Sequence, residues 1–221
     1  MHNVVNNLIS IQDELKIKIN KSNIENYNPN IIAVSKTFSI KDILPLINHG
    51  HVHFGENKVQ ESVEKWTDIK KDFNKIKLHM IGKLQSNKVK YVVALFDYIH
   101  SLDNLKLAKK ISEEQKKANK IMKLFIQINI GNEKQKNGIL IEDLDNFYNK
   151  CNKDLGLNVI GLMCLPPNDN NTLTYFSKMQ NLANKLKLKE ISMGMSNDYL
   201  AAIDFKATYL RIGSKIFGAR N

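Results

Sequence analysis

The chain has 221 residues, a hydrophobic fraction of 43% and a formal net charge of +11. This length suits one large α/β domain over residues 1–221, and the composition is typical of a water-soluble globular protein. No apolar run approaches the roughly 18 to 20 residues that span a bilayer, so we expect no membrane partner. Residues 1–20 lack the basic start and the continuous apolar stretch of a secretory signal, so we expect a cytoplasmic protein.

Cysteine and charge patterns exclude further classes. Cys151 and Cys164 are far apart and lack CxxC spacing, which suggests neither a disulfide framework nor a zinc site. The lysines are spread over most predicted helices and mixed with asparagine, as on solvated helix faces, so we expect no nucleic-acid partner. The two arginines, Arg211 and Arg220, both stand near the end of the sequence, which suggests a geometry that only a guanidinium supplies.

Short β-rich runs alternate with longer helical patterns, which indicates βα units and a parallel sheet. After an amphipathic segment at 1–20, eight strands are predicted at 31–36, 52–56, 77–82, 98–102, 124–130, 159–165, 190–196 and 209–217. Helical patterns occupy 40–49, 59–74, 86–95, 104–119, 141–152, 172–186 and 198–205. The order favours a single (β/α)8 TIM barrel whose extra N-terminal helix replaces the usual last one. A doubly wound open sheet is the alternative.

The residues that follow the predicted strands are polar or glycine, and in a parallel barrel those strand ends carry function. Lys36 ends the first strand, where partial desolvation in a barrel mouth would lower the pKa of its amine and let it attack a carbonyl group. Such a lysine forms Schiff bases. Taken alone, Lys36 is equally consistent with a surface lysine.

The last two strands supply groups that suit a phosphate. Gly194 and Gly213 allow backbone N–H groups to approach an anion, and Ser196 and Ser214 add hydroxyls, in the region where this fold usually binds phosphate. Residues 196–198 also have the pattern of a helix N-cap, which would direct the positive end of the next helix at the anion. The same pattern is consistent with a plain cap and a strand exit.

Arg211 lies two residues before Gly213 and should project to the same interior side, where it could face a ring nitrogen of a bound cofactor. A salt-bridged structural arginine is the alternative. His49, His51 and His53 lie near Glu56, but their spacing does not complete a ligand shell, so no metal site is expected.

Several segments together resemble one known family, the YggS/PROSC-type pyridoxal phosphate homeostasis proteins. The segments that carry the resemblance span the chain in order and are Ala33-Val34-Ser35-Lys36-Thr37, Phe54-Gly55-Glu56-Asn57, His79 with Ile81-Gly82, Leu84-Gln85-Ser86-Asn87-Lys88, Ser192-Met193-Gly194-Met195-Ser196 and residues 211–220.

The resemblance implies the barrel of the alanine racemase N-terminal domain, with pyridoxal 5′-phosphate (PLP) held by Lys36 as an internal aldimine. It also implies that Asn57 and Ile81 lie beside the ring and that Arg211 faces the pyridine nitrogen. The phosphate would be bound by groups of the last two strands, namely Ser196, Gly213 and Ser214.

A carrier of PLP without substantial catalysis is the function that the resemblance implies, with PLP-dependent apoenzymes as recipients. Racemisation needs two opposed acid–base groups, and racemases of this fold take the second from an additional β domain of a dimer partner. No such domain follows the eighth strand in this sequence, so we expect a monomer. The alternatives are a minimal amino-acid racemase that uses a local tyrosine such as Tyr199, and a basic nucleic-acid-binding protein.

Overall fold

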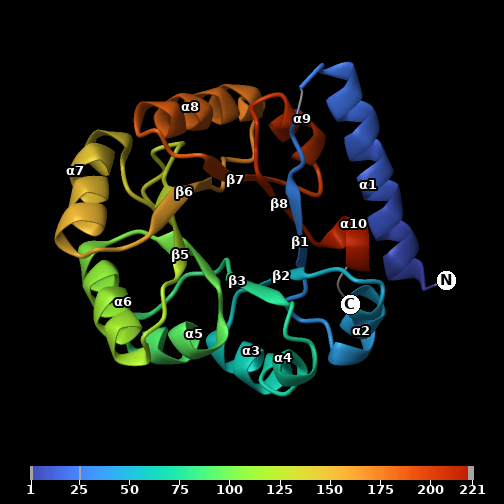
Figure 1. The fold of residues 1–221 in the computed structure, drawn as a ribbon. Coiled ribbons are helices and arrows are strands. Elements are labelled where there is room, and N and C mark those ends of the chain that lie inside the picture. Colours follow the sequence, from blue (N-terminus) through green and yellow to red (C-terminus); the bar gives the residue numbers. More distant parts are fainter. Residues whose placement is uncertain (1, 25, 219–221) are drawn as a thin grey trace.

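Eight parallel strands form a closed barrel in the computed structural model, which describes residues 2–24 and 26–218 (Figure 1). Each strand pairs with the next one along the chain, and β8 closes the circle by pairing with β1. The strands are β1 Asn30–Val34, β2 His53–Glu56, β3 Lys77–Met80, β4 Tyr98–Leu102, β5 Lys123–Ile128, β6 Val159–Cys164, β7 Glu190–Met195 and β8 Tyr209–Ile212. The predicted barrel is therefore confirmed, and the open sheet is wrong.

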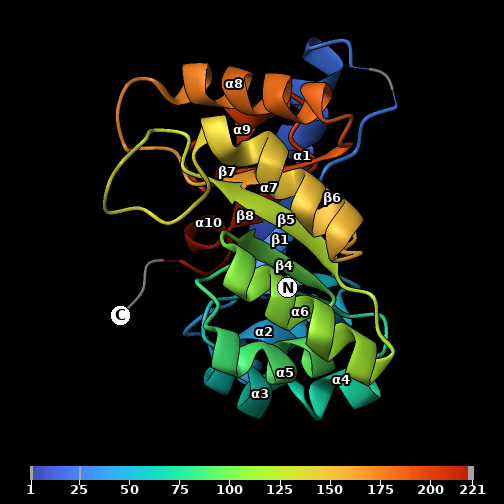
Figure 2. The same ribbon diagram turned by 90° about the vertical axis from the view of Figure 1, so that its left-hand side faces the viewer.

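Helices surround the barrel and connect successive strands (Figures 1 and 2). They are α1 Asn3–Lys21, α2 Ile40–Asn48, α3 Val59–Trp66, α4 Ile69–Asp72, α5 Val89–Leu95, α6 Leu105–Ala118, α7 Leu144–Asn149, α8 Thr172–Lys185, α9 Tyr199–Ile203 and α10 Ser214–Phe217. Short 3-10 turns at Ser86–Lys88 and Ile141–Asp143 precede α5 and α7, and a π-helical turn at Lys150–Asp154 follows α7.

Two predicted elements are divided in the structure. The helix expected over 59–74 stops after Trp66, where the Thr67 hydroxyl bonds back to the Val63 carbonyl oxygen, and it resumes as α4. The strand expected over 209–217 ends at β8, because the chain turns at Gly213 into α10. This turn moves the residues after β8 onto the rim of the barrel.

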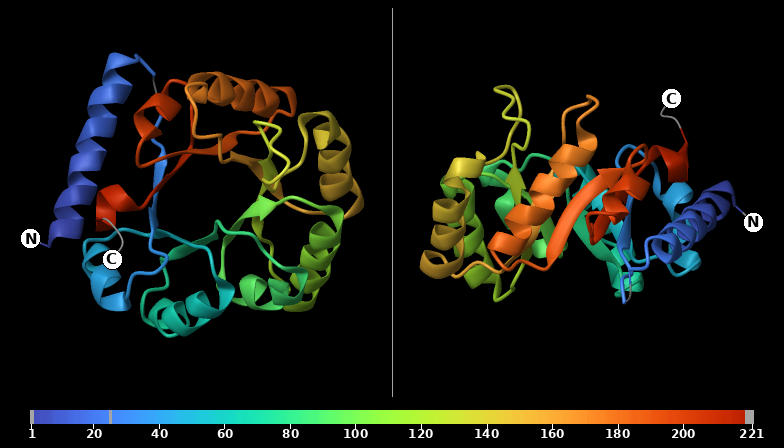
Figure 3. Two further views of the ribbon diagram at one scale, coloured as in Figure 1. Left: turned by 180° about the vertical axis from the view of Figure 1, so that it is seen from behind. Right: turned by 90° about the horizontal axis from the view of Figure 1, so that it is seen from above.

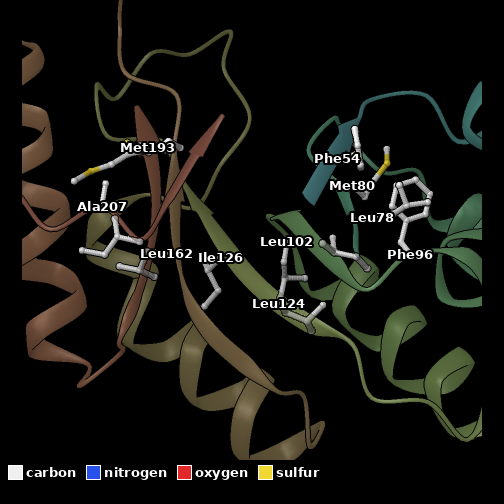
Figure 4. Packing of buried hydrophobic residues seen from close by; sticks show 14 of the residues in the cluster. Phe54, Leu78, Met80, Phe96, Leu102, Leu124, Ile126, Leu162, Met193 and Ala207 are labelled. Atoms are coloured by element: carbon white, nitrogen blue, oxygen red, sulfur yellow. The ribbon is translucent and has the colours of Figure 1, made fainter. Parts of the chain in front are cut away.

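The main apolar core lies between the strands and the surrounding helices. Outward-facing strand residues such as Leu78 and Leu124 are completely buried beneath the helices, and Phe54, Leu78, Met80 and Phe96 lie together in Figure 4. A smaller cluster fills the interior of the barrel and consists of Ile32, Tyr98, Phe125, Met163 and Tyr209. Apolar side chains therefore alternate between two cores along each strand, as a closed barrel requires.

The predicted N-terminal helix is present as α1. Its buried face consists of Val5, Leu8, Ile11 and Leu15, a spacing that places them along one side of a helix. α1 packs against α2, α9 and α10, and the side-chain amide of Asn7 donates to the carbonyl oxygen of Ile216 (Figure 1). Across the described residues, no helix combines the length and the apolar character needed to cross a bilayer.

Candidate functional site

A cavity of about 740 Å³ opens at the carboxyl ends of the strands. Loops after β5 and β6 project beyond the barrel at the same end as α10 (Figures 2 and 3). The cavity has the size of a typical small-molecule site. Its lining includes all seven residues predicted for the site, and these are Lys36, Asn57, Ile81, Ser196, Arg211, Gly213 and Ser214. They come from the ends of β7, β8, β1, β2 and β3, which are consecutive around the barrel.

Lys36 lies two residues after the end of β1 and is half-buried in the cavity wall. The next residue, Thr37, has a φ of 72°, which is a costly conformation for a β-branched side chain. The backbone N–H of Thr37 donates to the Glu61 carboxylate at 2.9 Å, which holds this turn. Unusual backbone conformations of this kind cluster at functional sites, where surrounding contacts maintain them.

A buried polar anchor holds the residue on the other side of Lys36. The Ser35 hydroxyl donates to Glu56 Oε1 at 2.7 Å, and Lys65 Nζ donates to the Ser35 carbonyl oxygen at 3.1 Å. Lys65 and Glu56 form an ion pair at 3.1 Å, with side chains that are 8% and 0% exposed. The Trp66 indole N–H also donates to Glu56 Oε1 at 2.9 Å. These four residues fix the backbone that carries Lys36.

This anchor is not predicted by the sequence motifs. In the sequence Glu56 stands out as part of a segment that resembles the family and as a neighbour of three histidines, and Lys65 is one of many helical lysines. A signal was present, because Glu56 ends an apolar strand and Glu61 and Lys65 are spaced one helical turn apart. A carboxylate is rarely buried unless it is paired, so a cationic partner for Glu56 could be predicted on the next helix, where Lys65 lies.

The rim formed by β7 and β8 presents backbone donors to one oxygen atom. Ser196 Oγ accepts hydrogen bonds from the backbone N–H groups of Gly213 at 3.3 Å and of Lys215 at 3.4 Å. Ser214 is exposed at the mouth of the cavity. Convergent backbone N–H groups with hydroxyls beside them are a recurrent arrangement for binding an anion. The rim can therefore receive a phosphate.

The predicted capping role of residues 196–198 differs from the structure. Asp198 occupies the N-cap position of α9, but its carboxylate accepts from the backbone N–H of Met195 at 2.6 Å instead of capping the helix. α9 is five residues long, so its dipole adds little to the rim. Gly194, at a φ of 88°, allows α9 to pack closely, because a Cβ there would lie 2.8 Å from the Ala202 Cβ.

Arg211 lies at the floor of the cavity and is only 4% exposed. Its Nη1 donates to Ser192 Oγ at 2.6 Å, and its Nη2 donates to the Cys164 carbonyl oxygen at 2.7 Å. Within the described residues Arg211 forms no ion pair, so the alternative of a salt-bridged arginine is wrong there. Burial lowers the pKa of Arg211 from its ordinary value, yet a guanidinium still acts only as a donor. Arg220 lies outside the described residues.

Asn57 and Ile81 complete the wall opposite the rim. Asn57 Oδ1 is buried without a hydrogen-bond partner. Gly82 packs directly against Asn57, since a Cβ at Gly82 would lie 2.5 Å from the Asn57 carbonyl oxygen. Gly55 makes room for Ile32 and Ile81, whose Cγ2 and Cδ1 atoms would lie 2.8 Å and 3.2 Å from a Cβ at that position. An unpaired buried amide oxygen is costly, and a hydrogen-bond donor on a ligand at this wall would satisfy it.

The cavity thus combines an amine, an anion-binding rim, a buried donor-only cation and an unpaired polar atom. These groups fit a phosphorylated aldehyde that contains a ring with a hydrogen-bond acceptor. The residues present therefore suit PLP, which has a phosphate, an aldehyde and a pyridine nitrogen.

Other candidate residues do not converge on a site. His51 Nε2 lies 2.9 Å from the His53 carbonyl oxygen, and no cluster of three or more possible metal ligands occurs among the described residues. Both cysteines are buried thiols, and burial raises the pKa of Cys151 and of Cys164 to about 12. Tyr199 is buried outside the cavity lining. Its hydroxyl bonds to Glu14 and to Lys215 instead.

Comparison with known proteins assigns the family. The family model described as alanine racemase, N-terminal domain, matches residues 13–221. The chain belongs to this family. Within the family, curated pyridoxal phosphate homeostasis proteins are close relatives. One from Haemophilus influenzae is 36% identical, with 99% of this chain and 97% of the relative covered. Another from Aquifex aeolicus is 36% identical over 86% of each chain. The resemblance inferred from the sequence motifs is confirmed.

Solved structures from the family share the barrel. PipY of Synechococcus elongatus without PLP has a TM-score of 0.87 at 30% identity, and 97% of this chain and all of PipY are covered. PipY with PLP bound has a TM-score of 0.85 at 29% identity and the same coverage. Alanine racemase of Bartonella henselae has a TM-score of 0.75 at 12% identity, with 98% of this chain but 58% of the racemase covered. The racemase therefore shows the fold alone.

Proposed function

We propose that this protein binds PLP through a Schiff base on Lys36 and carries it as part of intracellular vitamin B6 homeostasis, without substantial catalytic activity. The observation that carries the proposal is the meeting of Lys36, Arg211 and the Ser196–Gly213 rim in one cavity. The curated relatives named for PLP homeostasis and the PLP-bound structure of PipY support the same ligand.

Each residue of the cavity has a separate role in this proposal. When bound, PLP supplies an aldehyde that forms a carbon–nitrogen double bond with a primary amine. Lys36 provides that amine, and the anchor at Ser35 and Glu56 keeps it at the cavity wall. Arg211 would donate an N–H to the pyridine nitrogen, since only one hydrogen on each Nη is needed for its protein contacts.

The remaining residues hold the phosphate and the ring. Ser196 and Ser214 would donate their hydroxyls to the phosphate, and the backbone N–H of Gly213 would exchange its bond to Ser196 Oγ for one to the phosphate. Asn57 and Ile81 contact the ring, which would give the buried Asn57 amide a polar neighbour.

Two features favour a carrier over a racemase. Arg211 cannot transfer a proton to the pyridine nitrogen, so the ring stays a weak electron sink. Racemisation also needs a second acid–base group opposite the lysine. The described residues that line the cavity include no tyrosine or histidine, and besides Lys36 the possible acid–base groups are the exposed Lys83 and Asp198, whose carboxylate accepts from the backbone N–H of Met195. The hydroxyl of Tyr199 is bonded to Glu14 and Lys215 elsewhere.

We also propose a cytoplasmic monomer that passes PLP to apoenzymes and has no nucleic-acid partner. A net charge of +11 disfavours self-association, which supports the monomer. Sedimentation equilibrium tests this, and a dimer mass at micromolar concentration would contradict it.

PLP transfer is tested by mixing the loaded protein with an apoenzyme and following recovery of its activity. Binding of PLP should be unchanged by added nucleic acid.

The central experiment is trapping of the bound aldehyde. Purified protein is mixed with PLP, its absorption spectrum is recorded, and borohydride is then added to reduce the carbon–nitrogen bond. We expect the mass to rise by one reduced pyridoxyl phosphate group, located by peptide mapping on Lys36. The Lys36→Ala variant should gain nothing, whereas Lys83→Ala, which removes an exposed lysine from the same cavity, should react like the wild type. A label on another lysine, or an unchanged Lys36→Ala variant, would contradict the proposal.

A further inference from the structure

Three histidines form a continuous row of hydrogen bonds through the interior of the barrel. His53 Nδ1 lies 2.9 Å from His79 Nε2, and His79 Nδ1 lies 2.9 Å from His100 Nε2. His100 Nδ1 lies 2.9 Å from Ser192 Oγ, the atom that accepts from Arg211. We call His53, His79 and His100 the histidine chain. It joins the amino end of β2 to the floor of the cavity.

The histidine chain is enclosed by apolar rings. His79 and His100 are completely buried, and they stack on Tyr98 and Phe125 with ring centroids 4.1 Å and 4.2 Å apart. Burial lowers the pKa of both histidines well below its ordinary value. A neutral imidazole has one N–H donor and one acceptor nitrogen, so each buried ring depends on both of its neighbours.

Arg211 determines the direction of these hydrogen bonds. A guanidinium can only donate, so Ser192 Oγ must accept from it. The Ser192 hydroxyl can then donate its own hydrogen, and its acceptor among the described contacts is His100 Nδ1. It follows that His100 donates through Nε2 to His79 Nδ1, and His79 donates through Nε2 to His53 Nδ1. The opposite direction would leave the Ser192 proton without an acceptor among the described contacts.

We propose that the histidine chain and Ser192 are positioning residues for Arg211, linked in a single hydrogen-bond direction that starts at the guanidinium. This inference rests on the proposed function in one respect, which is that Arg211 meets the ring nitrogen of PLP. The histidine chain holds Ser192, and Ser192 holds Nη1 of Arg211. The remaining N–H groups of the guanidinium therefore keep a constant orientation toward the cavity. A guanidinium held in this way binds a ring acceptor without first losing side-chain freedom.

The first test uses the protein without PLP and requires no substitution in the site. Nitrogen-15 NMR of histidine-labelled protein at neutral pH distinguishes the two neutral forms of each ring. We expect His79 and His100 to carry their proton on Nε2, with slow exchange against water. The exposed His49 lies outside the histidine chain, so His49→Gln should leave these signals unchanged. A proton on Nδ1 of either buried ring, or a rapid mixture of both forms, would overturn the proposal.

The second test asks whether the histidine chain acts through the ring nitrogen. PLP is compared with its analogue that has carbon in place of that nitrogen, for the wild type, Ser192→Ala and His100→Gln. We expect both variants to weaken PLP binding about tenfold, the scale of one hydrogen bond to a charged donor. Binding of the analogue should change less than about twofold. Equal losses for both ligands would show a merely structural role and contradict the proposal.

Failure of the proposed function gives a different result. A wild-type protein that binds neither ligand would contradict PLP binding, while the NMR test would still decide the direction of the histidine chain. A substitution at His53, the residue of the histidine chain that is farthest from Arg211, should have a smaller effect. His53→Gln keeps a group that can accept a hydrogen bond from His79. This variant should retain PLP affinity within about threefold and retain the Nε2 proton of His79, and loss of that proton would count against the proposal.

Discussion

Ser35, the residue between β1 and Lys36, and Glu56, the last residue of β2, are joined by a hydrogen bond of 2.7 Å. Both side chains are fully buried, and Glu56 is also paired with Lys65. Removal of one partner from a buried ion pair costs more than the pair itself contributes, because the other charge remains buried. The anchor should therefore control both stability and the position of the Lys36 amine.

Glu56→Gln tests this anchor. We expect the free energy of unfolding to fall by about 2 kcal/mol, because Lys65 loses its buried partner and keeps only its ion pair with the partly exposed Glu61. Urea denaturation measures the change. The exposed Glu64 on the same helix as Lys65 provides a control, and Glu64→Gln should change stability by less than about 0.5 kcal/mol. PLP trapping on Lys36 should also slow in Glu56→Gln alone, and equal behaviour of the two variants would refute the anchor.

Two partly buried histidines predict a loss of stability in acid. Burial lowers the pKa of His51 and of His53 to about 4, from an ordinary value of 6.5. Between these values the unfolded chain binds more protons than the folded one, so stability present above pH 6.5 is lost as the pH falls toward 4. Each such shift corresponds to about 3 kcal/mol. Urea denaturation across this range should show a smaller loss for His53→Gln and an unchanged loss for His49→Gln.

The contact between Gly82 and Asn57 predicts a local effect on the cavity wall. In Gly82→Ala the new Cβ would lie 2.5 Å from the Asn57 carbonyl oxygen, so the loop must move. We expect stability to fall by about 2 kcal/mol and PLP to dissociate faster. Gly50 has a φ of 93° and open space around it. Gly50→Ala should therefore cost about 1 kcal/mol through backbone strain but leave the PLP dissociation rate unchanged. Equal rates in both variants would exclude this role for Gly82.

The role of Tyr199 distinguishes a PLP carrier from an amino-acid racemase. Its hydroxyl donates to the Glu14 carboxylate and accepts from Lys215 at 3.1 Å, away from the cavity lining. Loss of these bonds in Tyr199→Phe should cost about 1 kcal/mol of stability without affecting PLP binding. In deuterated water, proton NMR of alanine should show no exchange at Cα beyond that with free PLP, in either protein. Exchange in the wild type that disappears in Tyr199→Phe would support racemisation instead.

The barrel and the cavity residues could be predicted because they follow local rules. Alternating strand and helix patterns specified the fold, and strand ends specified where polar groups would gather. Lys36 and Arg211 follow that logic, since each lies at or just beyond the end of a strand that faces the cavity. The boundary after β8 was missed, because nothing in the apolar run at 209–217 marks a turn except Gly213.

The supporting contacts could not be predicted in the same way. His53 was considered only as a metal ligand beside His49 and His51, whereas its hydrogen-bond partner is His79 on the next strand. Such partners are far apart in sequence and meet only when strand register is known. Inward-facing histidines on consecutive strands were a usable signal. The backbone of Thr37, held by Glu61, has no sequence signature at all.

The pairing of β1 with β8 also bears on the order of events in protein synthesis. Lys36 leaves the ribosome early and Arg211 late, yet both line the same cavity. A nascent chain that lacks β8 lacks Arg211 and the backbone N–H groups of Gly213 and Lys215. We therefore expect PLP to bind only after the barrel has closed. Once bound, the ligand stabilises the entire closed barrel, because unfolding must release it.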